Sequence, residues 1–421
     1  MGITRASQWL IRAAASPGPS KSVAYRLMRQ GGFIARIDNG LFSLLPNGQR
    51  SVDRLQRIIE DELDDIGAQK VSYPILGPKT LWDRTDRWDK MGTELVKLRD
   101  RHDEEYCLQP TAEEMCTQSV LEMANVRKES MPILLYQTTE KFRDEAHPRY
   151  GLLRGRQFLM NDLYSFDLTQ EKAVETYQKV SDAYDRILRK RLNLDVFKVR
   201  ADSGVHGGRL SHEYHLRNPL NQDEIIYCHQ CKTGGNAKTE GECQQHGSEK
   251  MSSVEIAHTF QLGTKYSEVF GLSIESAPLD MCCFGIGVTR LIHAAIEAMS
   301  PTDESALRLP AAIAPFDVAV VVHGKLLDHP FTASLLSDLQ KKHKYILLDD
   351  RNETLGNRIR SLAHSGIPRY IVLGGKTVKS IDSQPTMELF VGEPMKSELT
   401  CLTKAATTNE IFQLLDSHRF L

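Results

Sequence analysis

An arginine-rich stretch between two apolar runs carries the residue types best suited to binding a phosphate. It reads KFRDEAHPRYGLLRGRQFLMNDLYSF and occupies residues 141–166. Arg143 and Glu145 stand two residues apart, so in an extended segment both side chains point to one face of a sheet. Glycine, proline and arginine follow, Arg154 among them, before the apolar run resumes at Phe158. Guanidinium groups bind phosphate through paired hydrogen bonds, so the pattern predicts a strand, a cationic loop and a returning strand that together hold a polyphosphate. A surface hairpin with a solvated basic tip would give the same pattern.

The segment LQPTAEE, residues 108–114, places a hydroxyl and carboxylates at the expected start of a helix. Pro110 restricts the preceding residue to an extended conformation, which leaves Thr111 well placed to cap that helix. Thr111 and Glu113 could present a hydroxyl and a carboxylate to a cationic amine. Acidic residues are also common in a first helical turn because they complement the helix dipole, so the segment alone leaves both interpretations open.

Glycines lie beside charged residues in two further stretches. In ADSGVHGGRLSHEYHL, His212 and Glu213 follow three glycines, although a lone His–Glu pair is more often structural than catalytic. In MCCFGIGVTRLIHAAIEAM, a strand passes through Gly285 and Gly287 into a helix that begins near Arg290. Such a junction admits a flat ligand and places a guanidinium over it, but a glycine pair can also mark tight helix–sheet packing. Between them, HTFQLGTKYSEVF at 258–270 alternates apolar and polar residues as a strand does.

Four residues have the spacing of metal ligands. Cys228 and Cys231 form one pair, and Cys243 and His246 form a second after eleven intervening residues. Two short knuckles of this kind suit a closed tetrahedral zinc site in a small ribbon, here residues 226–248. Free thiols in a reducing compartment are the alternative. A zinc ion held this way would be structural, because no ligand position remains open for water.

The composition limits the classes of protein to which the chain can belong. Its 421 residues are enough for two or three domains, and its 41% hydrophobic and 26% charged residues are typical of globular proteins. The net charge of −2 means that any contact with nucleic acid depends on local basic patches. No apolar run is long enough to span a bilayer, and eight cysteines in so long a chain do not indicate a secreted disulfide scaffold.

The N-terminus differs from the rest of the chain. Six Arg or Lys residues and no acidic residue precede Asp38, and Ser, Ala and Arg dominate. This composition is typical of an organelle transit peptide, and residues 1–21 are interpreted as a mitochondrial presequence. A basic arm on a cytosolic protein would look similar.

The longer periodic segments supply the elements that must position these groups. The spacing predicts helices over Ser51–Ile66 and Thr169–Leu192, and a strand over Gln69–Leu76 that ends at Pro74. Beyond Pro310, β-branched runs alternate with helical stretches, which predicts a separate α/β domain. Its basic residues could meet RNA or simply form a solvated helix face; they are Arg351, Arg358 and Arg360.

Taken in order, these segments resemble the three signature motifs of class II aminoacyl-tRNA synthetases. The motifs are the helix and strand ending at Pro74, FRDE at 142–145 with Phe158, and GIGVTR at 285–290. LQPTAEE, GGRLSHEY, HTFQLGTKYSE and LLDDR further resemble the prolyl-tRNA synthetase family of bacterial and mitochondrial type.

The resemblance implies an α+β fold of two domains. Residues 22–305 would form a catalytic domain with an antiparallel sheet flanked by helices, and residues 310–421 a smaller α/β anticodon-binding domain. It further implies a homodimer of the mitochondrial matrix that uses ATP and Mg²⁺ to convert proline to prolyl-adenylate. The prolyl group would then pass to the 3′ end of tRNA(Pro), without a covalent enzyme intermediate.

The resemblance also assigns roles to individual residues. Arg143 would bind the α-phosphate and the proline carboxylate, Glu145 the adenine amino group and Phe158 the adenine face. Arg290 would cover the opposite ring face and contact the γ-phosphate, and Arg143 and Arg290 are the catalytic pair. The remaining assignments are Arg154, Gln261, Thr264, Gly285 and Gly287 for ATP, Thr111, Glu113, His212 and His258 for proline, and Arg351 and Arg358 for the anticodon.

Three departures from the family pattern stand out. Gln157 replaces the usual acid before Phe158, and Ser361 stands where relatives often carry an acid. The stretch between the second and third motifs leaves no room for the editing domain of many bacterial relatives. Since a pocket rejects a slightly smaller amino acid only by roughly 10- to 200-fold per methylene, we expect mischarged alanine to be cleared in trans. The alternatives are a synthetase for threonine, glycine or histidine, or an inactive accessory subunit that binds tRNA or DNA; Arg143 and Arg290 argue against the latter.

Overall fold

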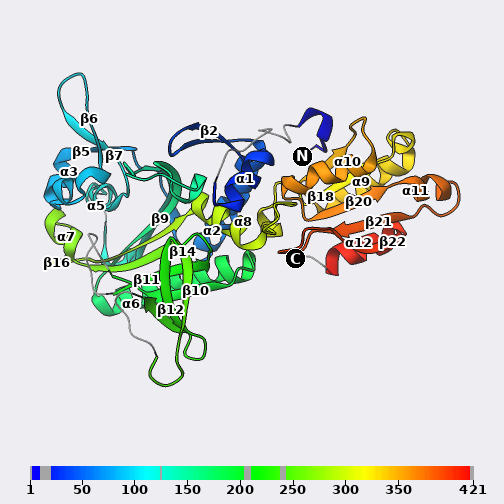
Figure 1. The fold of residues 1–421 in the computed structure, drawn as a ribbon. Helices are drawn as coiled ribbons and strands as arrows, with labels where there is room; N and C mark the ends of the chain where they lie inside the picture. Colours follow the sequence, from blue (N-terminus) through cyan, green and yellow to red (C-terminus); the bar gives the residue numbers. More distant parts are fainter. Residues whose placement is uncertain (1, 10–19, 124–125, 203–209, 238–242, 418–421) are drawn as a thin grey trace. The chain divides into compact units, whose positions relative to one another are not determined.

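The computed structural model describes residues 2–9, 20–123, 126–202, 210–237 and 243–417, and the chain divides into two compact units (Figure 1). The larger unit consists of residues 38–42 and 56–294, and the smaller unit of residues 1–37, 43–55 and 295–421. Residues 22–37 and 43–55 therefore belong to the same unit as the C-terminal part of the chain, although the sequence placed them in the first domain. The assignment of domains at 22–305 and 310–421 stays a prediction.

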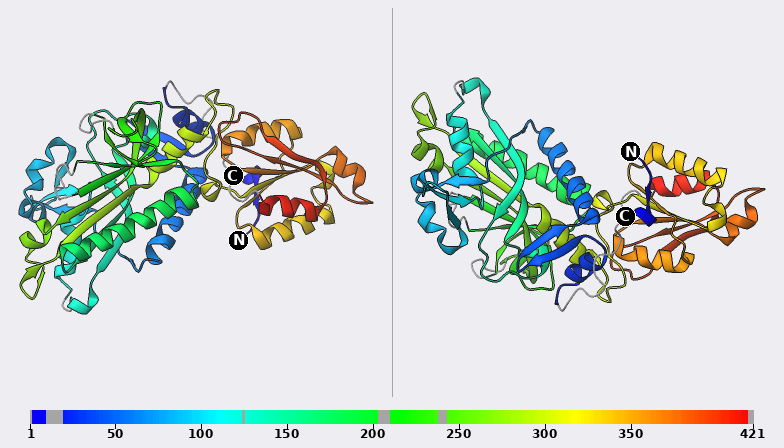
Figure 2. Two further views of the ribbon diagram at one scale, coloured as in Figure 1. Left: turned by 90° about the horizontal axis from the view of Figure 1, so that it is seen from below. Right: turned by 90° about the horizontal axis from the view of Figure 1, so that it is seen from above.

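A mainly antiparallel sheet runs through the larger unit (Figures 1 and 2). It has nine strands in the order β11-β10-β13-β12-β14-β17-β9-β8-β4. At its centre β8 pairs with β9 from Ile133↔Phe166 to Phe142↔Gln157, so the predicted hairpin is confirmed. The antiparallel sheet of the predicted α+β fold is confirmed as well. Its strands are β4 (Gln69–Lys70), β8 (Ile133–Phe142), β9 (Gln157–Asp167), β10 (Val196–Arg200), β11 (Leu210–Arg217), β12 (Asp223–Cys228), β13 (Thr233–Asn236), β14 (Glu249–Gly263) and β17 (Asp280–Gly287).

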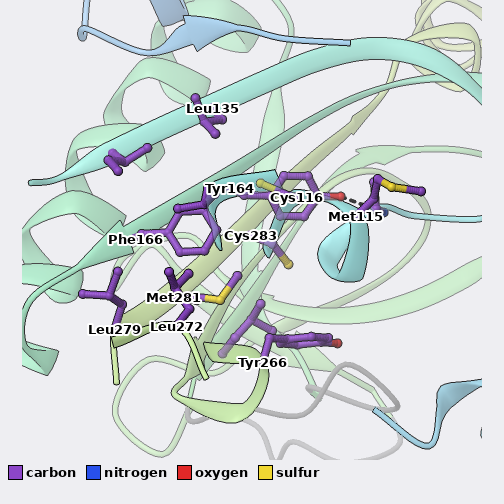
Figure 3. Close-up of a cluster of buried hydrophobic side chains, with 14 of the residues drawn as sticks. Met115, Cys116, Leu135, Tyr164, Phe166, Tyr266, Leu272, Leu279, Met281 and Cys283 are labelled. Carbon is purple, nitrogen blue, oxygen red and sulfur yellow. Dashed lines mark hydrogen bonds between the residues drawn. The ribbon is translucent and has the colours of Figure 1, made fainter. Parts of the chain in front are cut away.

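Helices cover this sheet and fix its core. Helix α6 (Gln170–Asp185), continued by a π-helical segment Arg186–Arg191, packs on β9, β14 and β17. The side chain of Thr169 caps its first turn. An apolar cluster lies between the sheet and two helices, α5 (Glu113–Leu121) and α7 (Lys265–Phe270) (Figure 3). Tyr164, Phe166, Met281 and Cys283 from the central strands contribute to it, and all are buried.

Two predicted strands are shorter than expected. The pairing with β8 covers Gln69 and Lys70 and ends with a bond from the Val71 amide to the Tyr136 carbonyl at 2.8 Å. It goes no further because the Tyr73 amide donates to the side chain of Gln137 at 3.0 Å and Pro74 has no N–H. The stretch predicted as a strand over residues 258–270 is a strand only to Gly263, where φ is +67°, and then becomes helix α7. Glycine permits this left-handed turn without steric cost. Helix α2 spans Pro46–Asp64, so it begins five residues before the predicted Ser51.

Trp82 and Trp88 are the centre of a small substructure in the larger unit. A three-stranded sheet of β5 (Leu76–Pro78), β7 (Glu105–Leu108) and β6 (Val96–Arg99) lies beside helices α3 (Lys79–Arg84) and α4 (Arg87–Lys90). Both tryptophans are buried together with Leu95 and Cys107. This substructure places a buried arginine, Arg87, beside Glu113 and Glu114 at the start of α5.

The smaller unit contains a six-stranded sheet in the order β1-β19-β18-β20-β21-β22, and the predicted α/β domain is confirmed. Strands β18, β19 and β20 are parallel, as alternating strands and helices require, and the last two are antiparallel. Its elements are β18 (Val318–Val322), α9 (Pro330–Lys342), β19 (Ile346–Asp349), α10 (Leu355–Leu362), β20 (Arg369–Leu373), α11 (Gly375–Ser380), β21 (Met387–Val391), β22 (Thr400–Ala406) and α12 (Thr408–Ser417).

The edge strand β1, Thr4–Arg5, comes from the segment that the sequence marked as a presequence. It pairs in parallel with β19, and Ala6 behind it is only 3% exposed. Ser7 donates hydrogen bonds from its amide and hydroxyl to Asp350 at 2.9 and 2.8 Å, and the Trp9 indole donates to Asn47 at 2.8 Å. Residues 3–9 are thus part of the folded unit, while residues 10–19 of the predicted presequence lie outside the described residues.

Among the described residues, no helix is both long and apolar enough to cross a membrane.

Candidate active site

A cavity of about 260 Å³ opens where β9, β14 and β17 meet the start of α5 and the loop of the β8–β9 hairpin. Its floor is continuous with the core, since Tyr164, Phe260 and Cys283 belong both to the buried cluster and to the cavity lining. Predicted site residues that line it are Thr111, Glu113, Arg143, Phe158, His258, Gly285, Gly287 and Arg290. The structure therefore brings together residues that lie up to 179 positions apart in the sequence, from Thr111 to Arg290.

Two ion pairs hold the hairpin loop. Arg154 Nε donates to Glu145 Oε2 at 2.7 Å, and Arg156 Nη2 donates to Asp144 Oδ1 at 2.7 Å. The Arg143 amide also donates to the carbonyl of Arg156 at 2.9 Å, which closes the base of the loop. Glu145 and Arg154 are thus paired with each other, and neither is among the residues that line the cavity.

Arg143 is a cation without an anionic partner among the described residues. Its Nε is buried and makes no hydrogen bond there, and its guanidinium carbon lies 5.3 Å from the centre of the Phe158 ring. Burial and the neighbouring Arg290 lower the pKa of Arg143, and the carboxylates of Glu255, Glu94 and Glu113 offset this only in part. Since Arg143 forms no ion pair with any of them, its guanidinium suits a phosphate or carboxylate bound in the cavity.

Arg290 enters the cavity from the first turn of helix α8 (Val288–Met299). Its Nε donates to the carbonyl of Leu153 at 3.1 Å, and its Nη1 lies 4.0 Å from Glu255 Oε2. A Cβ atom at Gly287 would lie 3.3 Å from the Cβ of Arg290, so a larger residue there would crowd the arginine. The predicted glycine–arginine junction is thus present at the end of β17.

Thr111 does not cap helix α5, contrary to the expectation. The helix begins after Ala112, which provides no side-chain cap, and the Thr111 hydroxyl instead donates to Glu113 Oε2 at 2.7 Å. The Ala112 amide donates to the Tyr164 hydroxyl, which in turn donates to Asp162. Side chains of β9 therefore fix the start of α5, and the capping interpretation of Thr111 was wrong.

Arg87 completes the acidic end of the cavity. It is fully buried, and its Nη1 lies 3.0 Å from Glu113 Oε2 and 3.0 Å from both carboxylate oxygens of Glu114. Its guanidinium also lies over the rings of Trp82 at 5.0 Å and Tyr266 at 5.8 Å. Sequence reasoning missed Arg87; the available signal was an arginine flanked by two tryptophans in LWDRTDRWDK.

The two predicted histidines occupy different places. His258 lines the cavity, stacks on Phe260 at 3.9 Å, and contacts Glu255 and Ser211 at 3.0 and 2.5 Å. His212 is hydrogen-bonded to the Tyr177 hydroxyl at 2.7 Å and is not among the lining residues. Burial lowers the pKa of His212 to about 4. A neutral His212 therefore supports β11 rather than presenting a charge.

A carboxylate that the sequence analysis overlooked, Glu255, lies at the centre of a second polar group. Burial raises the pKa of Glu255, but the hydrogen bond from His258 and the charges of His258 and Arg290 outweigh burial and lower it to about 2. Donor atoms of Glu213, Glu255 and His258 all lie within 4.8 Å of one another. Gln261 and Thr264, predicted for ATP, lie further along β14 and at the start of α7, outside the cavity lining.

Both arginines predicted for the anticodon are directed at Asp349. Arg351 Nη2 pairs with it at 2.6 Å, whereas Arg358 donates to the backbone carbonyls of Asp349 and Val322 at 2.7 and 2.8 Å. Arg358 is only 4% exposed. The structure does not support an RNA contact by Arg358, because its guanidinium is used within the fold. Ser361 donates to the carbonyl of Arg358, which explains why a small hydroxyl residue fits there.

Comparison with known families identifies the class of protein. Residues 95–299 match the model of the tRNA synthetase class II core domain (G, H, P, S and T), and residues 317–385 match that of the anticodon binding domain. In fold, the chain resembles a prolyl-tRNA synthetase from Cryptosporidium parvum complexed with halofuginone and AMPPNP, with a TM-score of 0.75 and 16% identity over 96% of this chain and 80% of that one.

Sequence comparison narrows the class. The chain is 39% identical to a human protein named "Probable proline--tRNA ligase, mitochondrial", over 83% of this chain and 77% of the relative. It is 33% identical to the proline--tRNA ligase of Agrobacterium fabrum, over 86% and 90% of the two chains. The chain belongs to the class II proline--tRNA ligase family.

Proposed function

We propose that the larger unit activates proline with ATP and transfers it to tRNA(Pro). In the first step the proline carboxylate displaces pyrophosphate from ATP and gives prolyl-adenylate. In the second step a ribose hydroxyl at the 3′ end of the tRNA displaces AMP. The observation that carries the proposal is the cavity itself, where Arg143, a cation without an anionic partner among the described residues, shares one space with the buried carboxylate of Glu113.

Arg143 is the residue best suited to the reacting phosphate and carboxylate. Both groups are anionic, and a guanidinium in a cavity shielded from water stabilises the charge that accumulates on the phosphorus oxygens. Arg290 adds a second cation from α8, and Phe158 offers an aromatic face to adenine. The chemistry needs alignment and charge neutralisation more than an acid, a base or a nucleophile.

Glu145 and Arg154 are assigned to ATP through the hairpin loop. Their ion pair has to open before Glu145 accepts a hydrogen bond from the adenine amino group and Arg154 reaches a phosphate. Both side chains are partly exposed, so this exchange costs little. Gln261 and Thr264, outside the cavity lining, complete the proposed ATP set.

Glu113 and Thr111 form the proposed site for the secondary ammonium of proline. The Glu113 carboxylate already receives the Thr111 hydroxyl and Arg87, which fix its orientation. Arg87 lies 3.0 Å from both carboxylates, and the ammonium of proline would add a second positive charge beside Glu113. His258 and Phe260 supply a stacked wall for the proline ring, and His212 supports that wall from β11.

The carboxylates of Glu213 and Glu255 fit Mg²⁺, which prefers oxygen ligands. When bound, Mg²⁺ would share the charge of the ATP phosphates. His258 holds the Glu255 carboxylate in place through its Nδ1. The cysteine cluster has no part in this reaction and is a candidate for a structural zinc ion.

The smaller unit would bind the anticodon stem of tRNA(Pro), since it carries the anticodon-binding module. Arg351 remains a candidate contact because it is partly exposed. Helix α2 and strand β4 belong to the first of the three signature motifs, and we propose that the chain forms the homodimer that the resemblance implies. The relatives named mitochondrial and the basic N-terminus support a location in the mitochondrial matrix.

Proline-dependent exchange between ATP and pyrophosphate tests the proposal. Wild type should exchange with proline and not with threonine, glycine or histidine, and Arg143→Ala should lose most of the rate while remaining folded. Gln157→Glu restores the usual acid of the family and should keep activity, because Gln157 is exposed at the start of β9. A wild-type protein that binds tRNA but shows no exchange with proline would favour the accessory-subunit alternative.

A further inference from the structure

Two short turns bring four metal-binding side chains together at one end of the β12–β14 region. Cys228 ends β12 and Cys231 follows in the next turn, while Cys243 and His246 precede β14. The Sγ atoms and one imidazole nitrogen all lie within 4.8 Å of one another. Cys243 follows Cys228 by fifteen positions in the sequence, so the fold brings the two turns together.

The distances match the edges of a tetrahedron around zinc. Cys231 Sγ lies 3.8 Å from Cys243 Sγ and 3.3 Å from His246 Nδ1. Zn–S bonds of about 2.3 Å at tetrahedral angles place two sulfurs about 3.8 Å apart, and a Zn–N bond of about 2.0 Å places sulfur and nitrogen about 3.5 Å apart. A disulfide between the two cysteines would instead need a separation of about 2.05 Å.

The backbone of both turns has the form of a metal knuckle. Lys232, directly after Cys231, has φ +56°, and Gly247, directly after His246, has φ +72°. In the first turn the Cys231 amide points back to Cys228 Sγ at 3.4 Å, and in the second the Gly247 amide donates to the Cys243 carbonyl at 3.0 Å. A left-handed conformation is unfavourable for lysine, so the ligand set gives a reason for holding it there.

This end of the sheet has little apolar packing of its own. Among the described residues, five form the apolar cluster beside it, and β13, with the sequence TGGN, adds little side-chain surface. Small substructures that cannot bury enough apolar surface are commonly stabilised by a metal.

We propose that Cys228, Cys231, Cys243 and His246 bind one structural Zn²⁺ that ties the end of β12 to the start of β14. Four protein ligands leave no position for water, so the ion takes no part in the reaction. Its effect on the reaction is indirect. Strand β14 runs from this end to Glu255 and His258 in the cavity, so the link restrains the strand that carries them.

Metal analysis of the full chain tests the site. Wild type expressed with added Zn²⁺ and freed of loose metal should contain about one zinc per chain. The double variant Cys231→Ser with Cys243→Ser should contain less than a tenth of that. Cys401→Ser, which alters a partly buried cysteine of the smaller unit, is the matched control and should retain full zinc.

Two further measurements keep the proposal testable if the double variant does not fold. His246→Cys preserves four soft ligands and should retain zinc and solubility. Wild type stripped with a chelator and loaded with Co²⁺ should show the visible absorption of tetrahedral thiolate coordination. Wild type with no more zinc than a buffer blank, or zinc content equal in the double variant and wild type, would overturn the proposal. These experiments measure bound metal and not proline-dependent exchange. A negative result would therefore refute the zinc site and leave the proposed function untouched.

Discussion

Replacing Arg87 by methionine tests how the acidic end of the cavity is held. The change keeps the approximate length of the side chain and removes a cation that lies 3.0 Å from carboxylate oxygens of both Glu113 and Glu114. All three side chains are buried, with Arg87 fully inaccessible. Removing one partner of a buried ion pair costs about 3–5 kcal/mol, because the remaining charge is left uncompensated. We expect a loss of unfolding free energy in this range, reduced where a carboxyl group takes up a proton.

The effect on catalysis should be confined to proline. Glu113 would lose the contact that fixes its orientation, and a hydrogen bond between charged groups contributes about 1.5–3 kcal/mol. That corresponds to a fall of roughly 10- to 150-fold in kcat/KM for proline, at 1.4 kcal/mol for each factor of ten. The KM for ATP should stay nearly constant, because Arg143, Phe158 and Arg290 do not contact Arg87.

The assay is ATP–pyrophosphate exchange with proline and ATP varied separately, combined with urea unfolding of the same preparations. Arg84→Met is the matched control, since Arg84 is exposed in the same segment and donates to Gln118 at 3.2 Å. Arg87→Lys keeps the charge and should recover part of the activity. The reasoning is refuted if folded Arg87→Met retains wild-type kcat/KM for proline, or if the KM values for proline and ATP rise by the same factor.

Three other outcomes are expected. Deleting residues 2–9 should lower the Tm of the smaller unit because β1 and its bonds to Asp350 are lost, and replacing buried Ala6 by Asp should lower it as well. An unchanged Tm would show that the edge strand contributes nothing to stability. The pKa of His212 is lowered from 6.5 in the unfolded chain to about 4 in the folded chain, so between these pH values the unfolded chain binds the proton and the folded chain does not. The unfolding free energy of wild type should therefore fall as pH drops from 6.5 to 4, and urea unfolding of His212→Gln should show a smaller fall. Arg358→Ala should reduce the free energy of unfolding by about 1–3 kcal/mol in chemical denaturation, because two buried carbonyls lose their donor. A selective rise in the KM for tRNA with an unchanged free energy of unfolding would contradict this expectation.

The sequence was most informative where residue type and spacing both constrain the chain. The basic loop between two apolar runs predicted a hairpin whose strands pair in register, but β8 ends at Phe142, so Arg143 and Glu145 follow the strand and do not share one of its faces. The GIGVTR segment predicted a strand-to-helix junction, which is present at Gly287 and Val288. Glycines, arginines and apolar alternation have strong local preferences, so their pattern survives folding.

Residues that act through distant partners could not be found in this way. Arg87 and Glu113 are 26 positions apart, and the two tryptophans of LWDRTDRWDK flank Arg84 as well, so the segment alone does not show which arginine is buried. Thr111 looked like a helix cap because its neighbours fit that role, but Tyr164 from β9 takes the Ala112 amide instead. The pairing of β1 with β19 joins residues more than 340 positions apart. Such contacts depend on tertiary structure, which local preferences do not encode.

Arg143 gives the last prediction, because stability and activity should move in opposite directions there. In the free protein its buried Nε has no hydrogen-bond partner among the described residues, and burial together with Arg290 outweighs the carboxylates of Glu255, Glu94 and Glu113, so its pKa is lowered. Arg143→Met should therefore leave the free protein as stable as wild type or raise its unfolding free energy by about 0.5–2 kcal/mol, while exchange is lost. ATP at 100 times its Kd should stabilise wild type by about 2.7 kcal/mol, since a ligand that binds only the folded state shifts the equilibrium by mass action. The variant should lose most of this gain, measured as the change in Tm with and without ATP. A variant that is clearly less stable than wild type without ATP would mean that Arg143 serves the fold rather than an anionic ligand.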